Sequence, residues 1–124
     1  MPIEYIDWLA RSTLRANPDK IYIFGDNAQR LGRGGQAAAC RGEPNALGVA
    51  TKWSPTMAPS AFFSDDDPDA GLIVRKDLQR VRHHLEQGAT IVVPSAGIGT
   101  GLSQMPQRCP KLLAHINSVL FPTR

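Results

Sequence analysis

The sequence is poor in cysteine and has no long apolar segment. Its 124 residues include two cysteines, Cys40 and Cys109, which are too few and too far apart for a zinc-binding framework. We expect both to be reduced thiols. No apolar run approaches the roughly 18 residues of a membrane span, and the first residues lack the basic and apolar regions of a signal peptide. These absences predict a cytoplasmic protein without a membrane partner.

The chain also lacks a strong excess of charge of one sign. Lys and Arg number 14 against 11 Asp and Glu, which gives a formal net charge of +3. The basic residues are scattered and are partly offset by the acidic run Asp65, Asp66 and Asp67, whereas nucleic-acid-binding proteins concentrate Lys and Arg on one face. A nucleic-acid partner therefore has no support in the sequence and would need the fold to create a basic face.

Two common phosphate-binding motifs and a convincing metal site are missing as well. Neither G-x-x-x-x-G-K-[ST] nor G-x-G-x-x-G occurs, which disfavours ATP hydrolysis. His83 and His84 are adjacent on a predicted helix and point about 100° apart, so they cannot share a metal ion. Asp65 to Asp67 could bind a cation, but helix capping in a solvated loop is the better interpretation. We expect no metal site and no bound cofactor.

Apolar periodicity predicts strands that alternate with helices. Buried strands are expected at residues 20–24, 47–51 and 90–93, and a weaker pattern at residues 3–8 suits an edge strand. Helices are expected at residues 12–16 with Ser12 as N-cap, from residues 34–40, around residues 74–85 and at residues 109–120. Residues 54–69, with three prolines, should form a surface loop. The order predicts one α/β domain over residues 1–124, with a mostly parallel sheet covered on both faces.

Most of the 11 glycines gather in two segments that follow predicted strands. In a parallel sheet, the loops after the carboxyl ends of the strands line one ligand cleft. The backbone N–H groups of these loops, and of the helix start at residues 34–37, could donate to phosphate oxygens. The pattern predicts a diphosphate-containing ligand; the alternative is that the glycines only supply turns with positive φ.

Four segments of the sequence resemble macrodomains in their order and setting. The likeness extends from about Lys20 to Leu120, and the chain also resembles small uncharacterised bacterial and phage proteins that share the Gly-Asp-Asn and Arg-Gly-Glu-Pro-Asn signatures. The resemblance implies a three-layer α/β/α fold and an ADP-ribose-type ligand. The segments are Phe24-Gly25-Asp26-Asn27, Gly32-Arg33-Gly34-Gly35-Gln36-Ala37, Ala50-Thr51-Lys52 and Gly97-Ile98-Gly99-Thr100-Gly101-Leu102.

Within macrodomains, the chain is most similar to the branch that removes terminal ADP-ribose from proteins. That branch implies that two glycine loops wrap the diphosphate and the distal ribose, and that the lysine after a threonine on the middle strand is the nucleophile. The nucleophile position corresponds to Lys52. The implied binding residues are Gly25, Gly34, Gly35, Gln36, Ala37, Gly97, Ile98, Gly99, Thr100, Gly101 and Leu102.

The candidate catalytic residues are Lys52, Asp26 and Asn27, and each has an alternative role. Lys52 could attack a substrate, pair with a diphosphate or be solvated. Asn27 could bind a ribose hydroxyl and Asp26 could orient water, or both could form an Asx-turn. Ser103 stands where the resembling branch has its catalytic aspartate, and serine is not a general base. Binding of ADP-ribose or a related NAD-derived nucleotide is therefore better supported than hydrolysis of an ADP-ribosyl linkage.

Other functions and other residues stay open at this point. A non-catalytic protein that sequesters a nucleotide signal, or a nucleic-acid or protein interaction module, would also fit the sequence. Arg41, Glu43 and Asn45 are expected to form a turn network more readily than a ligand contact. Trp53 and Phe62 could stack on a base, but packing under the proline-rich loop is the commoner role for such rings.

Overall fold

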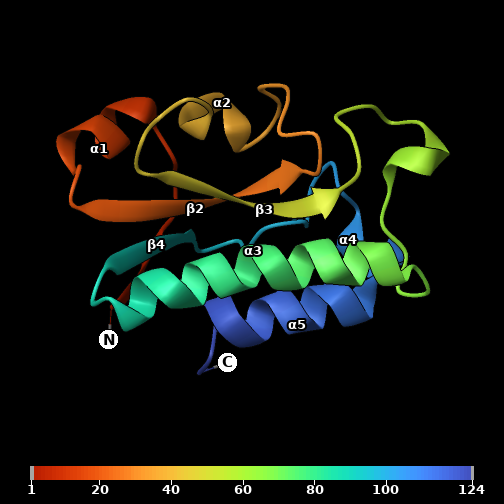
Figure 1. Cartoon of the computed structure of the whole chain (residues 1–124). Helices are drawn as coiled ribbons and strands as arrows, with labels where there is room; N and C mark the ends of the chain where they lie inside the picture. The colour runs from red at the N-terminus through yellow and green to blue at the C-terminus, as the bar shows by residue number, and fades with distance from the viewer. Residues whose placement is uncertain (1, 124) are drawn as a thin grey trace.

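The protein is built on a four-stranded parallel sheet between two layers of helices (Figure 1). The computed structural model describes residues 2–123. The strands are β1 (Ile3–Ile6), β2 (Lys20–Asn27), β3 (Ala46–Lys52) and β4 (Thr90–Pro94), and their order in the sheet is β1-β4-β2-β3. All three neighbouring pairs are parallel. The predicted α/β class with a mostly parallel sheet is confirmed.

The helices divide between the two faces of the sheet, which gives the predicted α/β/α layers (Figure 1). The short helices α1 and α2 cover one face, and the longer α3 and α5 cover the other. None of the helices in residues 2–123 is long and apolar enough to cross a membrane. Their bounds are α1 (Arg11–Ala16), α2 (Ala37–Cys40), α3 (Pro68–Glu86), α4 (Met105–Arg108) and α5 (Pro110–Leu120), with a 3₁₀ turn at Pro59–Ala61.

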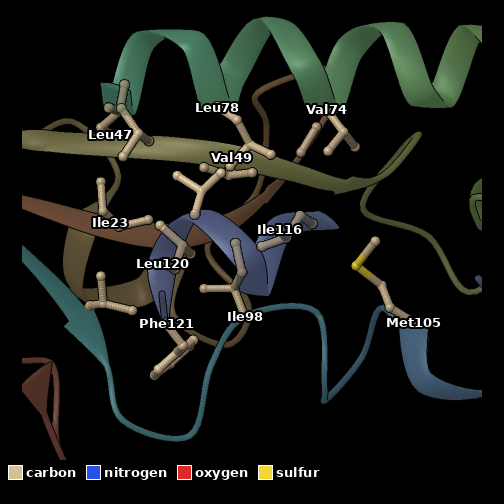
Figure 2. Packing of buried hydrophobic residues seen from close by; sticks show 14 of the residues in the cluster. Ile23, Leu47, Val49, Val74, Leu78, Ile98, Met105, Ile116, Leu120 and Phe121 are labelled. Carbon is tan, nitrogen blue, oxygen red and sulfur yellow. The ribbon is translucent and has the colours of Figure 1, made fainter. Parts of the chain in front are cut away.

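The larger hydrophobic core lies between the sheet and helices α3 and α5. Alternate residues of β2 and β3 point to this side, because successive side chains of a strand face opposite sides of the sheet. Figure 2 shows Ile23 and Val49 of the strands facing Leu78 of α3 and Leu120 of α5, and all four are fully buried. A smaller cluster on the other face packs the remaining strand residues against α1 and α2. The core thus holds the strand ends in fixed positions.

Several boundaries differ from the sequence-based prediction. Helix α1 has Ala10 as its N-cap, and Ser12 lies inside the helix. Strand β2 continues to Asn27, three residues beyond the expected end. The expected last helix is present as α5, and an additional short helix that the sequence did not predict, α4, precedes it; Cys109, with a non-helical backbone, separates the two. The expected edge strand near the N-terminus is present as β1, which pairs with β4.

The segment from residue 54 to residue 69 is only partly the expected surface loop. Ala61, Phe62 and Phe63 are buried, and Phe62 forms an isolated antiparallel bridge with Lys52. The acidic run has the expected capping role. Asp67 accepts a hydrogen bond from the backbone N–H of Asp69 at the start of α3, and Asp65 accepts from two N–H groups at the start of α5. These caps satisfy backbone donors that have no partner within a helix.

Candidate functional site

A cleft of about 270 Å³ opens at the carboxyl ends of the central strands, where the two glycine loops meet. This is the edge of a parallel sheet at which ligands generally bind. Nearly all of the residues proposed from the sequence line this cleft. The fold thus brings together segments that are 60 or more positions apart in the chain. They are Gly25, Asp26, Asn27, Gly34, Gly35, Gln36, Ala37, Lys52, Gly97, Gly99, Thr100, Gly101 and Leu102.

Ile98 is the exception among the proposed site residues. Its side chain is 1% exposed and belongs to the hydrophobic core rather than to the lining of the cleft (Figure 2). Several further lining residues were not proposed as ligand-binding from the sequence, although Gly32, Thr51 and Arg41 belong to the segments quoted above. These further residues are Leu31, Gly32, Arg41, Thr51, Pro55, Ala96 and Ser103.

Gln36 connects the two glycine loops through its side chain. Its Oε1 accepts a hydrogen bond from the N–H of Gly25 at 2.8 Å, and its Nε2 donates to the carbonyl of Gly97 at 3.0 Å. The Gln36 amide packs against Gly25, where a Cβ would lie 3.4 Å from Oε1. Gln36 therefore holds the two walls of the cleft together. It uses its side-chain amide for this, although the sequence had assigned Gln36 to ligand binding.

Both loops offer backbone donors to the cleft. Within residues 2–123, the N–H groups of Gly34, Gly35 and Gln36 in the first loop make no hydrogen bond, and neither do those of Gly99, Thr100, Gly101 and Leu102 in the second. Ala37 was expected to contribute as well, but its N–H donates to the carbonyl of Gly34 at 3.3 Å. Unpaired N–H groups converging from two loops favour an oxygen-rich, anionic ligand.

Asp26 is buried and forms a bidentate ion pair with Arg41. The Arg41 Nη1 and Nη2 atoms lie 2.9 Å and 2.5 Å from the two carboxylate oxygens, and Asp26 also accepts from the N–H of Asn27. The same guanidinium donates to the carbonyls of Leu31 and Gly32 and so fixes the first glycine loop. With both oxygens engaged, Asp26 positions Arg41 and the loop, and this arrangement does not support its expected role in orienting water.

Asn27 forms the local turn that was the alternative to ligand binding. Its Nδ2 donates to the carbonyl of Leu31 at 2.7 Å, and its Oδ1 accepts from the N–H of Gln29 at 3.1 Å. The side chain therefore stabilises the backbone that follows β2, as Asx-turns do. Its proposed contact with a ribose hydroxyl finds no support in this arrangement.

Lys52 is a buried cation at the edge of the cleft, so the solvated alternative is wrong. Its residue is 5% exposed, its Nζ donates to the carbonyl of Thr56 at 2.7 Å, and the ammonium lies 4.6 Å from the ring centre of Phe62. Among the described residues no carboxylate lies within ion-pair distance of it. Burial, followed by repulsion from Arg108, lowers the pKa of Lys52 below its usual value. An anionic ligand would supply the missing countercharge.

Ser103 and Thr51 form a hydroxyl pair in the cleft. Their oxygens are 2.6 Å apart, and Thr51 Oγ1 donates to the carbonyl of Asp26 at 3.0 Å. Because the single Thr51 proton is used in this way, Ser103 donates to Thr51 and keeps its own lone pairs for another donor. Ser103 thus supplies a neutral acceptor where a catalytic aspartate would have placed a negative charge.

The remaining candidates have structural roles. Glu43 pairs with Arg11 and Arg15, and Asn45 Nδ2 donates to three backbone carbonyls, whereas Arg41 binds Asp26 and lines the cleft. The expected network among Arg41, Glu43 and Asn45 is therefore not formed, because each side chain bonds to a different part of the chain. Trp53 packs edge-on against Phe63. These contacts favour packing over base stacking for Trp53.

The two cysteines and the histidines leave no metal site among the described residues. Cys40 and Cys109 are buried free thiols, and burial raises the pKa of each to about 11. No group of three or more His, Cys, Asp or Glu side chains in residues 2–123 could hold a metal ion.

Comparison with known proteins gave one match. Curated proteins and solved structures gave none. Residues 4–119, almost the whole length of the chain, match the model of a family of unknown function, DUF7831. That segment contains every residue that lines the cleft. The chain therefore belongs to the DUF7831 family, and the cleft is part of the unit that defines the family match.

Proposed function

We propose that the cleft binds ADP-ribose or a related NAD-derived nucleotide, with the diphosphate held between the two glycine loops. The observation that carries the proposal is that the same cleft combines N–H groups without a hydrogen-bond partner, from both loops, and the buried cation Lys52. Lys52 has no carboxylate partner in the described chain. Backbone donors and one fixed positive charge suit a diphosphate, which carries negative charge on several oxygens. The macrodomain resemblance adds the sugar and the base to this expectation.

The size of the cleft is consistent with part of such a ligand. Its volume of about 270 Å³ is near the lower limit of the roughly 300–1,000 Å³ found for small-molecule sites. The diphosphate and one ribose would fill it, and the base would lie at the mouth. Leu31 and Leu102 line the cleft and are more than half exposed, so they offer apolar surface there. Ser103 offers an acceptor for a ribose hydroxyl.

Binding without turnover is the form of the proposal that the geometry favours. Among the described residues, Asp26 is the only one with a carboxylate that lines the cleft, and both of its oxygens are bound to Arg41. A hydrolase would need a general base or a group that accepts the proton of its nucleophile. The second candidate, hydrolysis of an ADP-ribosyl linkage through Lys52, is favoured by the lowered pKa of that buried amine.

Calorimetric titration with ADP-ribose, NAD, ADP and cyclic nucleotides in parallel tests the proposal. ADP-ribose should bind most tightly. The double variant Gly34→Ala/Gly101→Ala suits the test, because neither residue has positive φ and a Cβ at Gly101 meets nothing within 4 Å. It should weaken binding at least about tenfold, or ~1.4 kcal/mol, by holding the phosphate away from the loops. Gly71→Ala, on helix α3, is the matched control and should bind like the wild type.

Two results would contradict the proposal. One is the absence of binding by any of these nucleotides, and the other is equal affinity in the double variant and in Gly71→Ala. Turnover is tested separately with an ADP-ribosylated protein as substrate. If ADP-ribose is released by the wild type and not by Lys52→Arg, the second candidate is correct, because a guanidinium stays protonated and cannot attack an anomeric carbon. No release supports binding alone.

The cytosol remains the proposed compartment. Two free, buried thiols fit a reducing environment, because oxidising compartments favour disulfides. The nucleotides named above would be available to the protein there.

A further inference from the structure

A second cavity, of about 240 Å³, lies between the turn that follows α2 and the outer edge of strand β3. Arg30, Arg41 and Arg80 reach it from three different elements, and Asp26 and Glu43 are its acidic residues. The sequence analysis did not anticipate it, because these residues are up to 54 positions apart in the chain. The cavity shares only Asp26 and Arg41 with the glycine-lined cleft.

The two carboxylates of this cavity already have guanidinium partners. Asp26 is held by both terminal nitrogens of Arg41, and Glu43 is held by Arg11 at 2.6 Å and by Arg15 at 3.1 Å. Each acidic residue is therefore neutralised by an arginine other than Arg30 or Arg80. Any further positive charge in the cavity must find its counterion elsewhere.

Arg30 and Arg80 have one buried carboxylate, that of Asp77, to share. Arg30 Nη2 binds both Asp77 oxygens at 2.7 Å and 2.8 Å, and Asp77 also accepts from the N–H of Ala50. Arg80 Nη1 stays 3.7 Å from Asp77, which is beyond hydrogen-bond distance. Two guanidinium groups against one carboxylate leave one positive charge without a partner of its own.

A buried donor in the same place also has no partner. Arg30 Nη1 is inaccessible to solvent, makes no hydrogen bond, and lies 3.7 Å from Asp26 Oδ2. A buried N–H group of a charged side chain without an acceptor is costly. The backbone N–H of Gly48 is a further donor. The N–H of Ala50 points away from β2 and donates to Asp77, and Gly48, two residues earlier on the same strand, points its N–H the same way.

We propose that this cavity, the arginine pocket, binds a phosphate group. Arginine is the side chain best suited to phosphate, since its planar fork of donors matches two phosphate oxygens at once. Arg80 and the Gly48 N–H would donate to the anion, Arg30 would add Nη1 once its guanidinium turns that atom toward the cavity, and the excess positive charge would be neutralised. A Cβ at Gly48 would lie 2.6 Å from Asp26 Oδ2, so glycine at this position leaves room for the Asp26 carboxylate beside the pocket.

The arginine pocket would also communicate with the cleft. Arg41 lines both cavities and fixes the first glycine loop through the carbonyls of Leu31 and Gly32. A phosphate near Arg41 would compete with Asp26 for its guanidinium. Occupancy of the arginine pocket should therefore be felt at the amides of the first glycine loop.

The test is an NMR titration of the ¹⁵N-labelled protein, first with inorganic phosphate and then with methyl phosphate. The amides of Gly42 and Gly48 should shift with a single affinity. Arg80→Gln should weaken that affinity about fivefold or more, because it removes a charged donor that holds no other close partner. Arg82→Gln, which removes the same charge from an exposed position of α3 outside the pocket, is the control and should stay within about twofold of the wild type.

The outcomes separate this proposal from the nucleotide cleft. Binding of both probes identifies the ligand as a terminal phosphate of a larger molecule, and binding of inorganic phosphate alone identifies it as the free ion; both support the arginine pocket. Absence of phosphate binding overturns the proposal, as does equal affinity in Arg80→Gln and Arg82→Gln. Shifts confined to Gly34, Gly99 and Gly101 also overturn it, because they would place the anion in the cleft.

Discussion

The substitution Gln36→Met tests whether one side chain holds the two glycine loops together. Methionine keeps the length and approximate volume of glutamine but can make neither of its two hydrogen bonds, to the N–H of Gly25 and to the carbonyl of Gly97. Both bonds have ordinary lengths, 2.8 Å and 3.0 Å, and both are partly buried. The variant therefore removes the connection between the loops and little else.

The expected loss of stability follows from those two bonds. At about 1 kcal/mol of net stabilisation for each, Gln36→Met should lower the free energy of unfolding by about 2 kcal/mol. For a domain of this size, that corresponds to a fall in Tm of about 8 °C. Affinity for ADP-ribose should fall in the same variant, since the loops would no longer be held at a fixed separation.

Urea and thermal unfolding followed by circular dichroism measure the stability, and calorimetry measures the affinity. Gln29→Met is the matched control, because Gln29 is exposed and its side chain makes no hydrogen bond to another described residue. The control should unfold within about 2 °C of the wild type. If Gln36→Met and Gln29→Met have the same Tm and the same affinity, Gln36 does not hold the cleft.

Three further predictions concern charge, thiols and backbone. Hydrogen bonds from two arginines lower the pKa of Glu43 from 4.5, so Glu43→Gln should be less stable than the wild type at pH 7. That difference in unfolding free energy should shrink as the pH falls through the lowered pKa, which urea titrations at pH 7 and pH 3 would show; a constant difference would refute it. Cys40 and Cys109, whose pKa burial raises to about 11, should resist alkylation at pH 8 when folded, and both should react in guanidinium without reductant. Gly99→Ala should destabilise the fold and Gly101→Ala should not, because Gly99 has φ +77° and a Cβ there would crowd the Met105 side chain; equal Tm values would contradict this.

The sequence predicted the sheet and the cleft because their signals are local. Short β-branched runs such as residues 20–24 and 90–93 are typical of buried parallel strands, and glycines after strands indicate loops at one edge of the sheet. The end of β2 was missed, because Asp26 and Asn27 are usual loop residues. Asp26 is paired with Arg41, a partner 15 positions away that only the folded chain brings close, and Asn27 bonds to the turn that follows the strand.

The roles of individual site residues were harder to predict than their positions. For Lys52 the sequence left nucleophile, diphosphate partner and solvated residue open, whereas in the structure Phe62 and the carbonyl of Thr56 cover it, and both come from a loop that the sequence placed on the surface. Gln36 was assigned to the ligand, and its use in joining two loops depends on Gly97, a contact across 61 positions of the chain. Pattern, spacing and the resemblance therefore located the cleft, whereas the contacts that hold its walls together needed the tertiary structure.

The central claim is that two glycine loops bind one nucleotide between them. Titration of the ¹⁵N-labelled protein with ADP-ribose, followed by amide chemical shifts, tests it most directly. The account predicts that the amides of Gly34 and Gly35 in the first loop and of Gly99 and Gly101 in the second shift together, with one dissociation constant. Shifts in only one of the two loops, or none at saturating ADP-ribose, would contradict it.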